Sequence, residues 1–197
     1  MNTPKTIPQL IHPPRLDNPE PCEEVEVDFV ELKAINKDLL LIEPVTYRYI
    51  DFSDCLLTNL SANNVVSFRS NTLRCVFKTC TLTGLQLPEG SFKDVVFEDC
   101  RLNLANFRNT TFERCIFRSC DLNEADFAAA KCVNVLFEDC QLIQTDFSNL
   151  SSTRLEFNGV SLSDIKGVGG LKGATLSQQN VAEIAPLLAG LLEMKVL

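Results

Sequence analysis

The sequence predicts an all-β fold, a solenoid with a four-sided cross-section and about six coils. Two observations lead to this prediction. A large apolar residue recurs at every fifth position from Phe52 onward, and the columns formed in this way repeat in blocks of twenty residues. The large residues are Phe52, Leu57, Phe77, Leu82, Leu87, Phe92, Phe97, Leu102, Phe107, Phe112, Phe117, Leu122, Phe127, Phe137, Leu142, Phe147, Phe157 and Leu162.

A second series of small residues stands two positions before the large ones. It comprises Cys55, Cys75, Cys80, Cys100, Ala105, Cys115, Cys120, Ala125, Ala130 and Cys140. Residues two apart in an extended chain lie on the same face of a strand. Each pentad therefore points one large and one small side chain inward and turns before the next pentad. Neither a helical period of about 3.6 nor a strand period of about 2 explains this pattern.

The twenty-residue period sets the number of sides. Blocks beginning VFKTC at Val76, VFEDC at Val96, IFRSC at Ile116 and LFEDC at Leu136 align in columns. Four pentads per coil give a square cross-section. Because stacked strands lie about 4.8 Å apart, residues 50–170 predict about six coils in a rod of roughly 30 Å.

One stretch departs from this register. Between Leu57 and Phe77 the large residues are Phe68 and Leu73, each one position late. The pattern predicts a bulge near Asn63–Val66 that is compensated near Leu73–Cys75.

The pentads also carry a family's motif. ADF at 125–127, ANF at 105–107, TDF at 145–147 and CDL at 120–122 resemble the pentapeptide-repeat family, in which a small residue, Asp or Asn, and Leu or Phe precede two variable residues. The resemblance extends over residues 50–170. It implies a right-handed quadrilateral β-helix, whereas the spacing alone gives four sides without a handedness.

The ends of the chain differ from the repeat in composition. Six prolines in residues 1–21 predict a disordered tail. Residues 22–49 are acidic and partly alternating, and we expect them to form an N-terminal cap over the exposed strand edges of the first coil. Glycines after residue 166 interrupt the repeat, and residues 171–197 are expected to form a C-terminal helical cap.

The predicted helix begins at an N-cap, Ser177, and Pro186 should kink it or divide it into two short helices. Its apolar stripe covers the open end of the last coil or pairs with a second chain. A helical cap of this kind also resembles pentapeptide-repeat proteins that dimerise end to end. We therefore predict a homodimer, with the contact formed by Val181, Ile184, Leu188 and Leu191.

Composition and single residues exclude several classes of function. A net charge of −8 argues against direct nucleic-acid binding, and no apolar run is long enough for a membrane helix. Nine cysteines without a signal peptide indicate a cytoplasmic protein. The one histidine, His12, lies in the Pro-rich tail, which removes catalytic triads and histidine metal sites. We expect no enzymatic activity, no cofactor and no metal.

Charged residues and cysteines both receive a structural interpretation. The column Lys78, Glu98, Arg118 and Glu138 alternates in sign, which predicts ion pairs between coils rather than an acid–base site.

Most cysteines occupy the small inward position, and Cys132 occupies a large one, so they are expected to be free thiols buried in the core.

A column of outward apolar residues is the main candidate for a binding site. Leu56, Val76, Val96, Ile116 and Leu136 stand just before the large inward residues at twenty-residue spacing. Three interpretations of this column are open. Residues 22–47 or the C-terminal helix cover it, or its members only stack on one another. In the third interpretation a protein partner binds along Val76, Val96, Ile116 and Leu136.

A solenoid with a filled core has no internal pocket, which places its function on the outer faces. The sequence therefore predicts a non-enzymatic protein-binding or scaffold rod. The alternative comes from the resemblance: some pentapeptide-repeat proteins imitate DNA, bind gyrase or another type II topoisomerase, and confer quinolone resistance.

Overall fold

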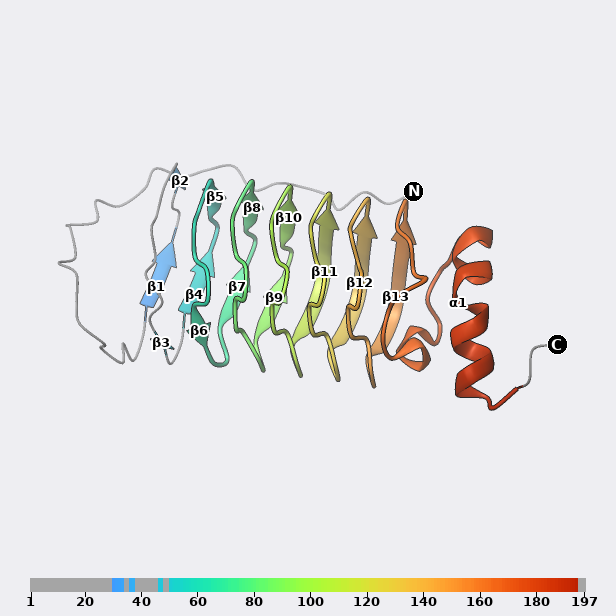
Figure 1. Ribbon diagram of the computed structural model, residues 1–197. Helices are drawn as coiled ribbons and strands as arrows, with labels where there is room; N and C mark the ends of the chain where they lie inside the picture. The colour runs from blue at the N-terminus through green and yellow to red at the C-terminus, as the bar shows by residue number, and fades with distance from the viewer. Residues whose placement is uncertain (1–29, 34–35, 38–45, 48–49, 195–197) are drawn as a thin grey trace.

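The computed structural model describes residues 30–33, 36–37, 46–47 and 50–194, and within them the chain forms a right-handed parallel β-solenoid with a C-terminal helix (Figure 1). Each strand pairs with the strand twenty residues away; Val96, for example, is the partner of Val76 and of Ile116. At twenty residues per coil, residues 50–149 make five full coils, and residues 150–169 begin a sixth. The predicted fold class is confirmed.

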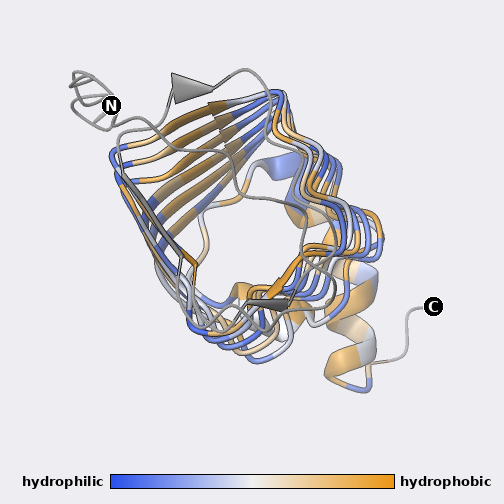
Figure 2. Cartoon of the chain, turned by 90° about the vertical axis from the view of Figure 1, so that its left-hand side faces the viewer, coloured by the Kyte–Doolittle hydropathy of each residue, from blue (hydrophilic) through white to orange (hydrophobic). Residues whose placement is uncertain are grey.

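Two of the four sides are built from strands. Side 1, around Phe112, and side 2, around Phe117, are separate strands in the first coils and merge into single eight-residue strands in the last three. The strands are β1 (Val30–Lys33), β2 (Asn36–Lys37), β3 (Thr46–Tyr47), β4 (Ile50–Ser53), β5 (Leu56–Thr58), β6 (Val66–Ser67), β7 (Asn71–Leu73), β8 (Val76–Lys78), β9 (Ser91–Lys93), β10 (Val96–Glu98), β11 (Thr111–Arg118), β12 (Lys131–Glu138) and β13 (Ser151–Asn158). Figure 2 looks along the rod and shows the coils stacked in one closed outline.

The other two sides consist mainly of β-turns. On side 3, around Leu122, the Ala125 N–H donates to the Leu122 carbonyl at 3.0 Å, and on side 4, around Phe127, the Ala130 N–H donates to the Phe127 carbonyl at 3.0 Å. The corner residue of each pentad has a positive φ, as at Asn109 (56°) and Asp139 (53°). Asn, Asp and Gly adopt this conformation at low cost, which explains why they are frequent at the second position after the large residue.

The core is a set of stacked columns. On side 2, Phe77, Phe97, Phe117, Phe137 and Phe157 stack with ring centroids 4.9 to 5.3 Å apart. This separation matches the spacing between coils, so each ring covers the next. Phe117 and Phe137 are fully buried.

The predicted bulge is wrong. The twenty-residue register holds through the whole stretch, with Ser61 paired to Thr81, Val66 to Gln86 and Phe52 to Thr72. Ser67 and Thr72 therefore occupy the large inward positions and are buried, whereas Phe68 is 49% exposed. Hydrogen bonds between backbones hold the register here, and the side chains adapt to it.

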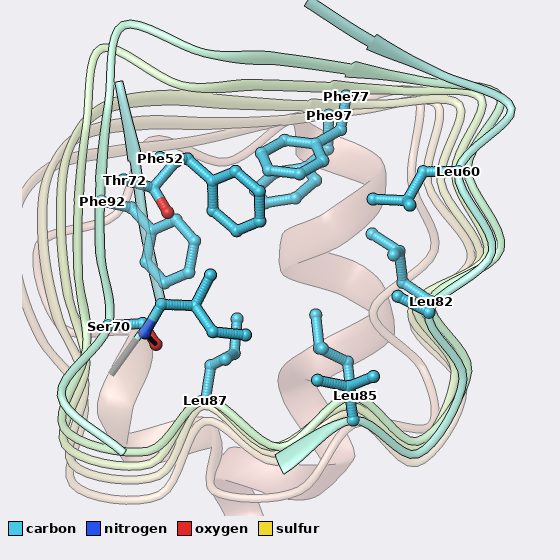
Figure 3. A pocket seen from close by; sticks show the side chains of 13 residues that line it. Phe52, Leu60, Ser70, Thr72, Phe77, Leu82, Leu85, Leu87, Phe92 and Phe97 are labelled. Atoms are coloured by element: carbon cyan, nitrogen blue, oxygen red, sulfur yellow. Dashed lines mark hydrogen bonds between the residues drawn. The ribbon is translucent and has the colours of Figure 1, made fainter. Parts of the chain in front are cut away.

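The first two coils contain an apolar cavity of about 30 Å³. Thr72 and Ser70 lie on its wall beside Phe52, Phe77 and Phe92 (Figure 3). The cavity arises because Thr72 is smaller than Phe52 and Phe92, its two neighbours in the same column. The expectation of a completely filled core is therefore corrected for these coils.

The N-terminal segment is described only in part. Strands β1, β2 and β3 pair in parallel with β4, β5 and β6, again twenty residues away. They thus continue the solenoid beyond Ile50 within the range expected to cap it. Residues 1–21, the expected tail, lie outside the described residues.

After the 3₁₀ helix η1 (Val168–Leu171), the helix α1 (Gln178–Leu191) covers the end of the last coil (Figure 1). Ser177 caps it, as predicted: its hydroxyl accepts a hydrogen bond from the Asn180 N–H. The helix continues through Pro186, so the division into two helices is wrong. Asn180 Nδ2 donates to the Val160 carbonyl at 2.8 Å, and Glu183 accepts from the Leu162 N–H at 2.8 Å. Both bonds satisfy backbone groups that the end of the solenoid would otherwise leave unpaired.

Candidate partner-binding surface

The outward apolar column is a continuous ladder on side 2. We call Leu56, Val76, Val96, Ile116 and Leu136 the side-2 ladder; each is the direct strand partner of the next. Ile116 is 7% exposed, and the other four are half-buried. The column ends in polar residues, because Asn36 pairs with Leu56 and Glu156 pairs with Leu136. The structure therefore brings together the four residues predicted to bind a partner.

Ion pairs border the side-2 ladder. In the column immediately after it, Lys78 lies 3.1 Å from Glu98 and Arg118 lies 2.6 Å from Glu138, which confirms the predicted pairing between coils. Each charge beside the ladder has a partner of opposite sign. An apolar surface with a neutral border is suited to a partner that brings apolar side chains.

A second row of pairs stands at the corner between sides 1 and 2. The Arg114 guanidinium donates to both carboxylate oxygens of Asp94, at 2.5 and 2.9 Å. These hydrogen bonds lower the pKa of Asp94 below its ordinary value. Because both side chains are more than a third exposed, water screens the pair, and it contributes less than about 1 kcal/mol to stability.

Acidic residues on the remaining sides are less balanced. Six of the described acids that lie on sides 3 and 4, or on the corner before side 3, have no ion-pair partner. They are Asp99, Asp121, Glu124, Asp139, Asp146 and Asp164. Arg101 and Lys166 interrupt them. Four of these six acids thus lie on the two turn sides of the rod.

The cysteines belong to the core. All eight described cysteines are buried, and none of them forms a disulfide. Five of the thiols donate to backbone carbonyls of the preceding coil, as where Cys140 Sγ donates to the Phe117 carbonyl at 3.3 Å. Burial raises the pKa of Cys115 and of Cys132 to about 12, so both remain protonated and poorly nucleophilic at neutral pH. Cys22 lies outside the described residues.

The cavity of the first two coils is too small to bind a metabolite. Its volume of about 30 Å³ accommodates roughly one or two water-sized groups.

Within the described residues, no group of three or more His, Cys, Asp or Glu side chains is arranged to hold a metal ion. No helix in the same part of the chain is long and apolar enough to cross a membrane.

The four predicted dimer residues lie on one face of α1 but differ in exposure. Ile184 is buried against the last coil and Leu188 is partly buried there. Val181 (52% exposed) and Leu191 (58%) lie on the free surface. Leu192 and Met194 are also exposed.

The sequence reasoning also missed apolar residues on the turn sides. Leu104 (49% exposed) and Ile143 (54%) both lie on side 3, and Leu104 has a φ of 61°. The signal for both was available, because they occupy the two variable positions that follow the large residue of a pentad.

The comparison with protein-family models agrees with this architecture. The family model for the pentapeptide repeat region matches residues 70–127 and 91–166, and the comparison with curated proteins finds no match. A pentapeptide repeat protein (Rfr23) from the cyanobacterium Cyanothece 51142 is 10% identical, with a TM-score of 0.36 over 64% of this chain and 91% of that chain.

Two further solved structures are those of QnrB1, a plasmid-mediated fluoroquinolone resistance protein. A trypsin-treated variant is 16% identical, with a TM-score of 0.32 over 77% of this chain and 99% of that chain. The full-length form is 14% identical, with a TM-score of 0.25 over 70% and 99%.

Proposed function

Because the chain belongs to the pentapeptide-repeat family, we propose that it is a non-enzymatic rod that binds a protein partner through its outer faces, in the cytoplasm. The side-2 ladder carries this proposal. It offers five apolar side chains in one straight column, bordered by neutral ion pairs. Since the cavity of the first coils holds at most a few atoms, a ligand of any size binds on the outside.

The test is a charge placed on the ladder. Full-length protein with Val96→Asp should lose the partner captured by the wild type from its native cell, because a carboxylate would then have to be buried against the partner's apolar side chains. Thr81→Asp is the matched control. Thr81 occupies the same pentad position on side 3, is also half-buried, and pairs with Arg101.

Both variants must first show wild-type unfolding in urea, which separates loss of binding from loss of fold. Equal capture by Val96→Asp and by the wild type would reject the side-2 ladder as the binding surface.

The second candidate function is topoisomerase binding by imitation of DNA. The observation that favours it is the set of six acids without an ion-pair partner on sides 3 and 4 and on the corner before side 3, which is the kind of charge that a DNA-binding groove attracts. Arg101 and Lys166 interrupt the set and make it the weaker candidate. Capture of DNA gyrase that is lost with Glu124→Gln and retained with Val96→Asp would select this function.

The predicted homodimer is a separate proposal. Val181, Leu191, Leu192 and Met194 are exposed apolar side chains on α1 and on the turn after it, and a second chain would cover them. Light scattering of Leu191→Glu and of the wild type tests it. A wild-type chain that remains monomeric at micromolar concentration would leave α1 as a cap only.

A further inference from the structure

The side-2 ladder has a defined length and polarity. Its five rungs occupy successive coils, and at about 4.8 Å per coil the distance from Leu56 to Leu136 is about 19 Å. Beyond Leu136 the same column continues with the exposed carboxylate of Glu156. An occupant that matches this surface is therefore extended along the rod axis, apolar on one face, and basic at the end that reaches Glu156.

The chain itself contains a sequence with these properties. In residues 1–16 an apolar residue recurs at every third position: Pro4, Ile7, Leu10, Pro13 and Leu16. Four prolines in this stretch favour the polyproline II conformation. That helix has about three residues per turn and rises about 3.1 Å per residue. Side chains three apart then share one face at about 9.3 Å, close to the roughly 9.6 Å of two coils.

We infer that residues 7–13 dock along the side-2 ladder of their own chain. Six residues of polyproline II span about 19 Å, which equals the length of the ladder. Ile7 then lies over Leu136, Leu10 over Val96 and Pro13 over Leu56. Each docked residue covers a rung and its neighbours, so that the apolar column is removed from water.

The position of the attachment point and the charges fix the direction. Val30 begins β1 beside the first coil, at the end of the rod where Pro13 docks. The sixteen residues between them extend to about 55 Å, ample for the connection. Lys5, two residues before Ile7, then reaches the coil of Glu156. Residues 1–16 contain Lys5 and Arg15 and no acid, whereas the connecting residues 17–28 contain six acids.

This inference rests on the proposed function and adds a regulator to the same surface. The docked segment occupies the ladder that we assign to the partner, so the partner binds by displacing it. The segment also indicates the partner's chemistry: an extended, proline-containing stretch with an apolar residue at every third position and a basic group at one end.

The first test is cross-linking in the purified full-length chain. A photoreactive benzoylphenylalanine replaces Leu10, and in the control it replaces Ile11, which is also apolar but lies off the three-residue period. We expect cross-links from position 10 to peptides that contain Val96 and Ile116, within one chain. Val96→Asp should reduce their yield at least about tenfold, because the new carboxylate opposes an apolar residue.

Three outcomes would overturn the inference: equal and scattered cross-links from positions 10 and 11, cross-links from position 10 to α1 or to sides 3 and 4, and cross-links between two chains. The last would make a second copy the occupant. This experiment needs no partner, so its failure leaves the proposed function standing, while failure of partner capture leaves the cross-links unaffected.

The second test measures competition with a fluorescent peptide of residues 4–16. The peptide should bind the full-length Leu10→Asp chain at least about tenfold more tightly than the wild type, whose ladder is already occupied. Ile11→Asp should behave as the wild type. Peptide binding that is equal for all three chains, or that survives Val96→Asp in the Leu10→Asp chain, contradicts docking on the ladder.

Discussion

The coils from residue 90 to 149 and the coils from residue 50 to 89 share one backbone but differ in how well their cores are filled. In the later coils the large inward positions hold Phe, Leu or Cys132, with almost no exposure. In the earlier coils Ser67 and Thr72 stand at such positions and a cavity remains. Both regions keep the twenty-residue register. The comparison shows that hydrogen bonds between coils set the register and that the side chains set how tightly the interior is packed.

Truncating a stacked phenylalanine should give the largest difference between the two regions. Phe117 is fully buried, with rings 5.0 and 4.9 Å away on either side. Phe117→Ala should lower the free energy of unfolding by about 3–5 kcal/mol, because the rigid columns cannot collapse into the space. Phe52→Ala, beside the existing cavity, should cost at least about 1 kcal/mol less.

Urea denaturation of both full-length variants measures this difference. Equal losses for the two variants would mean that the first coils are packed as firmly as the later ones. A loss below about 1 kcal/mol for Phe117→Ala would contradict the stacked core itself.

The buried thiols of Cys115 and Cys132, whose pKa is raised by burial, should make stability depend on pH. Burial raises the pKa of Cys132 to about 12 from a reference value of 9.0. A raised pKa in the folded state stabilises the protein below the unfolded value, and this contribution is lost as the pH rises from about 9 to 12. Each such thiol lowers stability by about 1.4 kcal/mol per pH unit in this window.

Cys132→Val removes one titrating thiol from this window. The slope of unfolding free energy against pH above about 9 should therefore be less steep than in the wild type by that amount. Identical slopes would show that the Cys132 thiol titrates in the folded protein as it does in the unfolded chain.

The repeat made the fold predictable because inward residues are read directly from a five-residue spacing. Phe117, Cys120 and Leu122 fall where the spacing places them, and all are buried. Prediction failed at Phe68 and Leu73, where size alone suggested a shift of register. Arg69 and Arg74 are corner residues with a left-handed backbone, like the corner residues at the same positions of all the other coils. This backbone geometry keeps Ser67 and Thr72 inside, and the size of the side chains does not reveal it.

The candidate site was predictable in position but not in surroundings. Spacing alone placed Val76, Val96, Ile116 and Leu136 in one column. The lower exposure of Ile116 depends on the three-dimensional environment, which a one-dimensional pattern does not contain. The same holds for α1: the helical period identified the apolar residues, but only the docking of the helix on the last coil separates Ile184 from Val181.

The smallest predicted effect is a gain in stability from filling the cavity. Thr72→Leu restores the large residue at a position where the cavity of about 30 Å³ has room for added methyl groups, so the free energy of unfolding should rise by about 1 kcal/mol. The matched control is Thr110→Leu, in the tightly packed coils. Thr110 is fully buried and its hydroxyl donates to the Leu87 carbonyl at 3.0 Å, so the same substitution should overpack the core and lose that bond, at a cost of about 1–3 kcal/mol. Opposite signs in urea denaturation would show that the first coils retain unused space, whereas a loss at Thr72 comparable to that at Thr110 would show that the first coils are packed as tightly as the rest.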